Sequence, residues 1–180
     1  MKKYLTVTSR LLVAAIALSG LCLVANAQTT DESKTSTTSK LSMNDKKFVR
    51  KAYKGGMMEV ENAKMAKDKA KNDATKDVAE RMITDHSKAN EKLMDIAKEE
   101  NLDLSKVQVK PATMSGGDNF DKEYLTMLKK DHEKDIAMFE KEASDSGAKE
   151  DSDVVKFAKD TLPTLKEHLQ MVEDALGKLK

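Results

Sequence analysis

Cysteine is almost absent from this sequence, which has one cysteine and no tryptophan among its 180 residues. That residue, Cys22, lies in an N-terminal segment that we expect to be removed, so the mature chain would contain none. Such a chain has no disulfide framework and no cysteine nucleophile. Lipid attachment at Cys22 is not indicated either, because Leu21 stands where a lipoprotein signal requires a small residue. Stability must therefore come from the burial of apolar side chains.

An excess of charge of one sign is also missing. The formal net charge is +1, and removal of a leader with three basic and no acidic residues leaves 29 basic and 31 acidic residues. A balanced chain lacks the positive field that attracts the nucleic-acid backbone, so we predict no nucleic-acid partner. The two signs are interleaved along the chain, which is typical of solvated helix faces.

The first 27 residues have the layout of a secretory signal peptide. Lys2, Lys3 and Arg10 form a basic start, an apolar run of 14 residues extends from Leu11 to Val24, and Ala25-Asn26-Ala27 provides a cleavage site. The run is shorter than the ~20 apolar residues of a spanning helix, so we expect no transmembrane segment after cleavage. The sequence therefore predicts export, to the periplasm or to an association with the outer membrane.

The mature chain divides into a Ser/Thr-rich tether over residues 28–44 and one folded domain over residues 45–180. Apolar residues recur at steps of three and four in four segments, which predicts helices over residues 45–71, 74–100, 119–144 and 150–178. The link over residues 101–118 can reach ~60 Å, whereas a helix of this length measures only ~39 Å. Two helical hairpins joined by one long crossover, in an all-α ferritin-like four-helix bundle, is the predicted fold. Pro163 should bend the last helix without ending it.

Each predicted helix places one metal-capable side chain on its apolar face: Glu59, His86, His132 and His168. The first three are near the middle of their helices and therefore at one level, while His168 is offset by ~6 Å. We predict that the four side chains form one polar layer inside the bundle. Gly55 and Gly56 precede Glu59 by one turn at a cost of ~2 kcal/mol relative to alanine. They indicate either a kink or the close approach of a neighbouring helix.

Three imidazoles and one carboxylate suit a single Zn²⁺, Fe²⁺, Cu²⁺ or Mn²⁺ ion by donor type. A self-satisfied, metal-free hydrogen-bonded layer is the alternative, because buried ionisable groups need partners of some kind. A di-iron site is not indicated, since Ile83, Lys129 and Leu165 occupy the positions where Glu-x-x-His motifs carry glutamate. If imidazoles bind an ion, its occupancy should fall below about pH 6.

Acidic residues precede each histidine and one follows His132. Asp85, Asp131 and Glu167 point about 100° away from the adjacent histidine, so we expect them to flank the site, with an outer-shell role on a neighbouring histidine as the second interpretation. Asp135 has the spacing to turn inward, but a solvated surface position is its default expectation.

The order of several motifs resembles a family of exported bacterial ferritin-like proteins that is catalogued as a domain of unknown function and whose members are often named as outer-membrane proteins. The resemblance extends over residues 44–180 and rests on Phe48-Val49, Gly56, Glu59, Met82, Asp85-His86, Phe120-Asp121, Tyr124, Met127, His132, Phe139, Phe157-Ala158, Leu162-Pro163, Leu165 and His168-Leu169. It implies a ferritin-like fold and an envelope location. It assigns no catalytic residues, because the family has no established activity.

Two functions from different classes follow from the sequence. One is an exported bundle that binds one transition-metal ion, and the other is a metal-free structural or interaction protein of the envelope. No Ser/His/Asp array or phosphate-binding glycine loop is present, so we predict no catalytic residues of those kinds. The chain has eleven methionines, and five of them are candidates for a copper(I) site: Met57, Met58, Met65, Met82 and Met138. They fall at helical core spacing, so we interpret them as core filler. Protein partners and oligomeric state are left open.

Overall fold

The computed structural model describes residues 40–144 and 152–179. These residues form helices α1 (Met43–Lys69), α2 (Asp73–Glu99), α3 (Phe120–Ala143) and α4 (Asp153–Lys178), with a short 3-10 turn, η1 (Gly117–Asn119), before α3. No strand occurs among the described residues. None of the helices described here combines the length and the apolar character needed to cross a bilayer. The predicted signal peptide and most of the predicted tether lie outside the described residues.

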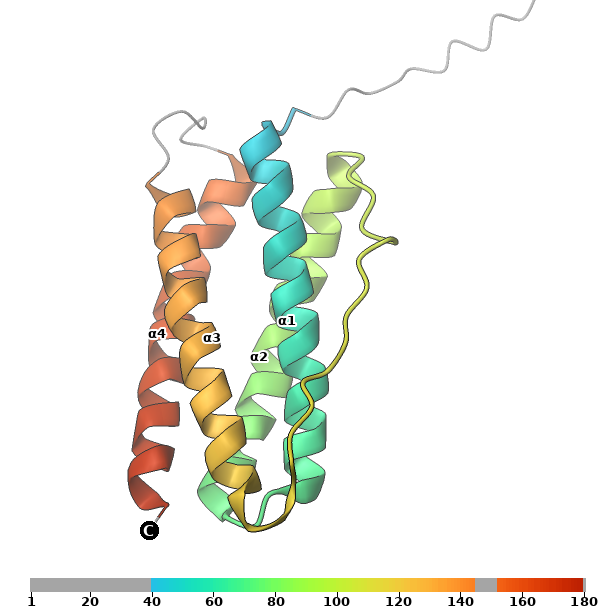
Figure 1. Ribbon diagram of the computed structural model, residues 1–180. Helices are drawn as coiled ribbons and strands as arrows, with labels where there is room; N and C mark the ends of the chain where they lie inside the picture. The colour runs from blue at the N-terminus through green and yellow to red at the C-terminus, as the bar shows by residue number, and fades with distance from the viewer. Residues whose placement is uncertain (1–39, 145–151, 180) are drawn as a thin grey trace, which may run out of the picture. The chain divides into compact units, whose positions relative to one another are not determined.

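The four helices form a bundle in which sequence neighbours pack together. The most extensive contacts join α1 to α2 and α3 to α4, and smaller contacts join α2 to α4 and α1 to α3. In Figure 1, α1 and α4 run downward whereas α2 and α3 run upward, and the chain between α2 and α3 descends along the outside of the bundle. The predicted all-α bundle with two hairpins and a long crossover is therefore confirmed.

Capping residues set the helix starts. Ser42 and Asp45 form a reciprocal capping box at α1, and the Asn72 side chain accepts a hydrogen bond from the Ala74 amide at α2. As a result α1 begins at Met43, two residues earlier than predicted, and ends at Lys69. Helix α4 begins at Asp153 and continues through Pro163, so the prediction of one helix rather than two is correct.

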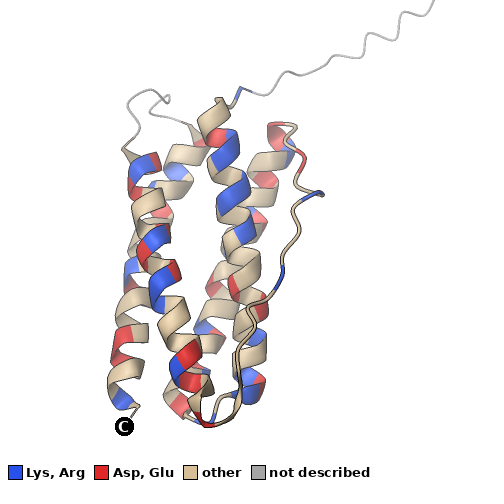
Figure 2. Ribbon diagram, in the orientation of Figure 1, with Lys and Arg blue, Asp and Glu red and all other residues tan. Residues whose placement is uncertain are grey.

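Buried apolar side chains form two separate clusters along the bundle. One cluster includes Ala63, Met82, Phe120, Tyr124, Leu128 and Val172, and the other includes Phe48, Ala52, Leu93, Phe139, Phe157 and Leu165. In each helix the metal-capable residue lies between members of the two clusters, as His132 lies between Leu128 and Phe139. The charged residues are spread over the outside of all four helices (Figure 2). The core is thus interrupted at a single level by polar side chains.

The crossover is attached to the bundle by side chains of α1 and α3. The buried Asn62 accepts a hydrogen bond from the Ala112 amide at 2.8 Å. The Glu123 carboxylate accepts hydrogen bonds from the amide and the hydroxyl of Ser115. Asn62, which the sequence analysis did not single out, therefore fixes the crossover against α1.

Asp121, at the start of α3, stabilises the short link between α1 and α2. Its carboxylate accepts hydrogen bonds from the amides of Lys71 and Asn72 at 3.1 and 3.0 Å, and the residue is buried. Burial alone would raise the pKa of Asp121, but these two donors outweigh it and lower the pKa. Asp118, in contrast, pairs with the side chain of Lys71 and is almost fully exposed.

We predict that Asp121→Ala lowers the free energy of unfolding by about 1–3 kcal/mol, because two backbone amides lose their acceptor. Because the folded pKa of Asp121 is lowered, its contribution is present above the unfolded-state value and is lost as the pH falls through the folded value. Urea denaturation at neutral pH measures the difference. Asp118→Ala is the control and should leave the unfolding midpoint unchanged. Equal midpoints for Asp121→Ala and the wild type would contradict the assignment.

Candidate metal centre

The four metal-capable side chains come together inside the bundle, one from each helix. Glu59, His86, His132 and His168 are 3, 6, 0 and 1 % exposed. The centroids of the His86 and His132 rings are 5.5 Å apart, and both lie 5.3 Å from that of His168. One nitrogen of each ring lies within 4.8 Å of the others. The predicted offset of His168 along the bundle therefore does not separate its ring from the other two.

Glu59 contacts two of the three rings. Its Oε2 lies 2.6 Å from Nε2 of His86, and its Oε1 lies 3.3 Å from Nδ1 of His132. Despite the short separations, neither oxygen nor His86 Nε2 has a partner with hydrogen-bond geometry among the described residues. The 2.6 Å separation is that of an ion pair between His86 and Glu59, and it is shorter than the distance between two ligands of a tetrahedral ion.

The contacts of His132 and His168 place two lone pairs face to face. Nδ1 of His132 lies 3.1 Å from the Leu128 carbonyl oxygen, and Nε2 of His168 lies 3.0 Å from Oδ2 of Asp85. Both oxygens are acceptors, so each ring uses its single N–H on its outer side. The inner nitrogens, His132 Nε2 and His168 Nδ1, are then unprotonated and only 3.2 Å apart.

With both N–H groups on the outer side, the two neutral rings have no proton left for this inner contact. Three arrangements satisfy it: His132 takes its other tautomer and donates from Nε2, one ring becomes a cation, or a metal ion binds both nitrogens. For ~2.0–2.1 Å metal–nitrogen bonds at a tetrahedral angle, two ligand nitrogens are ~3.3–3.4 Å apart, close to the observed separation. The arrangement of these two rings therefore fits a shared metal ion.

Burial favours the neutral form of these two rings, whereas His86 favours the carboxylate form of Glu59. Burial lowers the pKa of His132, and it lowers the pKa of His168 to about 4. Burial would raise the pKa of Glu59, but the charge on His86, with smaller effects from the other two rings, outweighs it and lowers the pKa. His86 behaves differently: burial lowers its pKa, but Glu59 outweighs burial and raises it. His86 is thus the ring that holds a proton most readily.

Of the three acids that precede a histidine, one reaches the cluster. Asp85 accepts the hydrogen bond from His168, a residue of another helix, and also pairs with Arg81 on its own helix. Burial would raise the pKa of Asp85, but His168 and Arg81 outweigh it and lower the pKa. A metal-binding histidine commonly donates its outer N–H to such a carboxylate.

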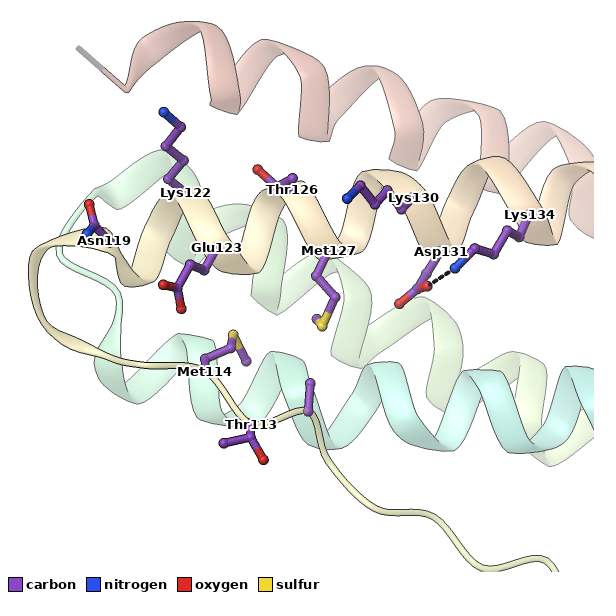
Figure 3. Close-up of a pocket in the computed structure, with 11 residues that line it drawn as sticks. Thr113, Met114, Asn119, Lys122, Glu123, Thr126, Met127, Lys130, Asp131 and Lys134 are labelled. Atoms are coloured by element: carbon purple, nitrogen blue, oxygen red, sulfur yellow. Dashed lines mark hydrogen bonds and ion pairs between the residues drawn. The ribbon is translucent and has the colours of Figure 1, made fainter.

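The other two acids lie away from the rings. Asp131 pairs with Lys134 at 3.2 Å and lines a groove of about 760 Å³ between α3 and the crossover, in which Met114 and Met127 lie (Figure 3). Glu167 is exposed, with an oxygen 3.8 Å from Nη2 of Arg81.

The expectation that Asp135 is a solvated surface residue is wrong. It is only partly exposed, faces α1 near Gly55 and lines a small cavity next to His86. Burial, together with the charge of Glu59, raises the pKa of Asp135 to about 7. The packing of α3 against α1 turns this carboxyl group inward, and its spacing of three residues from His132 was the available signal.

Sequence reasoning missed two buried polar groups near the cluster. Asn90 follows His86 by four residues, a helical spacing that places it on the same face, and it is 4 % exposed. The hydroxyl of Tyr124 is buried without a hydrogen-bond partner among the described residues, and burial, together with Glu59, raises its pKa. In the sequence analysis, Tyr124 is named only among the motif residues of the resemblance.

Searches of curated proteins and of solved structures found no match. A family model described as "Domain of unknown function (DUF4142)" matches residues 30–175, which include Glu59 and all three histidines. The match covers well over half of the chain, and it confirms the predicted membership of a family without an assigned function. The chain belongs to the DUF4142 family of domains of unknown function.

Proposed function

We propose that this protein binds a single transition-metal ion in the core of its bundle, through His86, His132 and His168 with Glu59 as the carboxylate donor. The observation that carries the proposal is the approach of His132 Nε2 to His168 Nδ1, 3.2 Å apart with both outer nitrogens engaged by acceptors. Imidazole and carboxylate donors suit Zn²⁺, Fe²⁺, Cu²⁺ or Mn²⁺.

The proposal includes export, which is supported by the layout of residues 1–27. An ion held in the bundle would then serve storage, sensing or protection in the bacterial envelope. A chain beginning at Gln28 in a periplasmic or outer-membrane fraction, identified by mass spectrometry, is the expected result. A retained leader in the cytoplasmic fraction would contradict the location.

A metal-free envelope protein is the second candidate, and the ion pair of His86 with Glu59 favours it. One proton on His86 satisfies part of the layer without an ion, because it offsets the charge of the buried carboxylate. The two candidates differ in their response to a chelator. Metal binding raises the melting temperature over that in EDTA, whereas a self-satisfied layer melts at the same temperature in both.

We predict that the mature wild-type protein binds one equivalent of metal and that His132→Gln loses it. Removal of a ligand should weaken the affinity by more than the roughly 10- to 100-fold that loss of an outer partner costs. Elemental analysis of untagged protein after dialysis measures the content. Asp131→Asn is the matched control, because Asp131 is adjacent in sequence but pairs with Lys134. The same metal content in His132→Gln and in Asp131→Asn would contradict the site.

We predict a second difference between two acids that both precede a histidine. Asp85→Asn should weaken metal affinity by roughly 10- to 100-fold, because His168 loses the carboxylate that fixes its tautomer. Glu167→Gln should bind as the wild type does, because Glu167 is exposed. Competition with a chromophoric chelator measures both affinities. An equal loss of metal affinity in the two variants would contradict a specific role of Asp85, because the loss would then reflect surface charge in general.

Metal occupancy should depend on pH, because only unprotonated imidazole nitrogens bind metal. His86 has a raised pKa and takes up a proton first as the pH falls, whereas the lowered pKa values of His132 and His168 keep them neutral further into acid. Occupancy at limiting metal should therefore decline from neutral pH downward and be largely lost below about pH 6. Equilibrium dialysis between pH 8 and pH 5 tests this dependence. An occupancy that stays constant down to pH 5 would argue against imidazole ligation.

A further inference from the structure

The N-terminal half of α1 carries basic residues and no acidic ones. No aspartate or glutamate stands between Asp45 and Glu59, and the basic residues of this stretch are Lys46, Lys47, Arg50, Lys51 and Lys54. Lys46 is partly exposed and the others are exposed. Spacings of three and four residues place the exposed ones on one face of the helix. This part of α1 therefore presents charge of a single sign to solvent.

The crossover adds a second stretch of the same kind beside the first. Residues 104–117 contain no acid, and the lysines among them, Lys106 and Lys110, are exposed. Leu102 belongs to the same apolar cluster as Phe48, so the start of the crossover packs near this half of α1. Figure 2 shows basic segments on both. We call the basic residues of these two stretches the basic surface.

The cations of the basic surface have no acidic partner among the described residues. The ion pairs that lysine and arginine form there involve other residues: Lys64, Lys67, Lys71, Lys76, Arg81, Lys129, Lys134 and Lys166. Asp45 and Asp103, which border the two stretches, are already engaged. Asp45 is buried in the capping box of α1, and Asp103 accepts hydrogen bonds from the amide and the hydroxyl of Ser105. The charge of the basic surface is thus left for another anion.

The apolar side chains beside these cations indicate which anion fits. Phe48 is buried and Tyr53 packs against the same cluster, so neither ring is free to stack on a base, as proteins that bind single-stranded nucleic acid require. Met43, in contrast, is 78 % exposed and lies one turn before Lys47 on the same face of α1. An exposed apolar side chain at the end of a row of cations suits the boundary between the headgroups and the acyl chains of a bilayer.

We propose that the basic surface binds the phosphate headgroups of an anionic lipid membrane and attaches the folded bundle to it. Lysine and arginine attract the anionic phosphates, while Met43 enters the boundary between headgroups and acyl chains. The apolar face of α1 stays in the core of the bundle, so the attachment is peripheral and depends on charge. None of these residues belongs to the metal centre, so membrane binding does not require the ion.

Co-sedimentation of the mature protein with lipid vesicles tests the proposal. Vesicles of phosphatidylglycerol and phosphatidylcholine in equal amounts should bind the wild type, whereas vesicles of phosphatidylcholine alone should not. Each basic residue near an anionic surface contributes about fivefold in affinity, so the triple variant Lys47→Gln, Lys51→Gln, Lys54→Gln should bind roughly 100-fold more weakly. These positions are exposed and glutamine has the helix propensity of lysine, so the variant should fold. Binding should also weaken as salt is added, because salt screens exposed charges.

The triple variant Lys67→Gln, Lys76→Gln, Lys166→Gln is the matched control, because it removes the same charge from lysines that pair with acids elsewhere on the bundle. It should bind the anionic vesicles as the wild type does. An equal loss of binding in the two triple variants would overturn the proposal, as would equal binding of the wild type to both kinds of vesicle. Tighter binding of the wild type to duplex DNA than to the anionic vesicles would assign the surface to a nucleic acid and overturn it as well.

Discussion

The structure depends on the burial of three imidazoles and one carboxylate at one level between two apolar clusters. Removing such groups from water is unfavourable unless each polar atom finds a partner. The outer atoms do so through Asp85 and the Leu128 carbonyl, while the inner nitrogens of His132 and His168 face each other. A cation at this position would satisfy both inner nitrogens, which is the basis of the metal site proposed above.

The bundle supplies the required geometry at low conformational cost. Four helices of similar length each carry the critical residue near the middle, so the side chains meet whichever way each helix runs. The crossover, attached at Asn62 and Glu123, returns the chain to the opposite end and sets α3 antiparallel to α1. Apolar packing on both sides then holds the rings in place, which is the preorganisation that a metal site needs.

The sequence was sufficient to predict the fold and the inward side chains, because both depend on a helical period that persists over whole segments. Val78, Met82, His86 and Leu93 define one face whatever the neighbouring helices do. The positions beside that face could not be assigned in the same way. Asp85, Asp131 and Glu167 have the same local context, yet only Asp85 reaches a histidine. The relative rotation of packed helices decides this, and no single helix encodes it.

Asn90 and Asp135 illustrate the same limit beside the histidine cluster. Both have helical spacing from a histidine, but polar residues at the edge of an apolar face turn inward only where the facing helix leaves space. Gly56 leaves that space, and its partner Asn90 is identified only by the contact between α1 and α2.

X-ray diffraction from crystals of the mature protein grown with a transition metal tests the central claim most directly. Data collected above and below the absorption edge of that metal locate the ion by anomalous scattering. The account predicts one peak within bonding distance of His132 Nε2 and His168 Nδ1, with His86 and Glu59 around it. A bundle centre without a peak would contradict it.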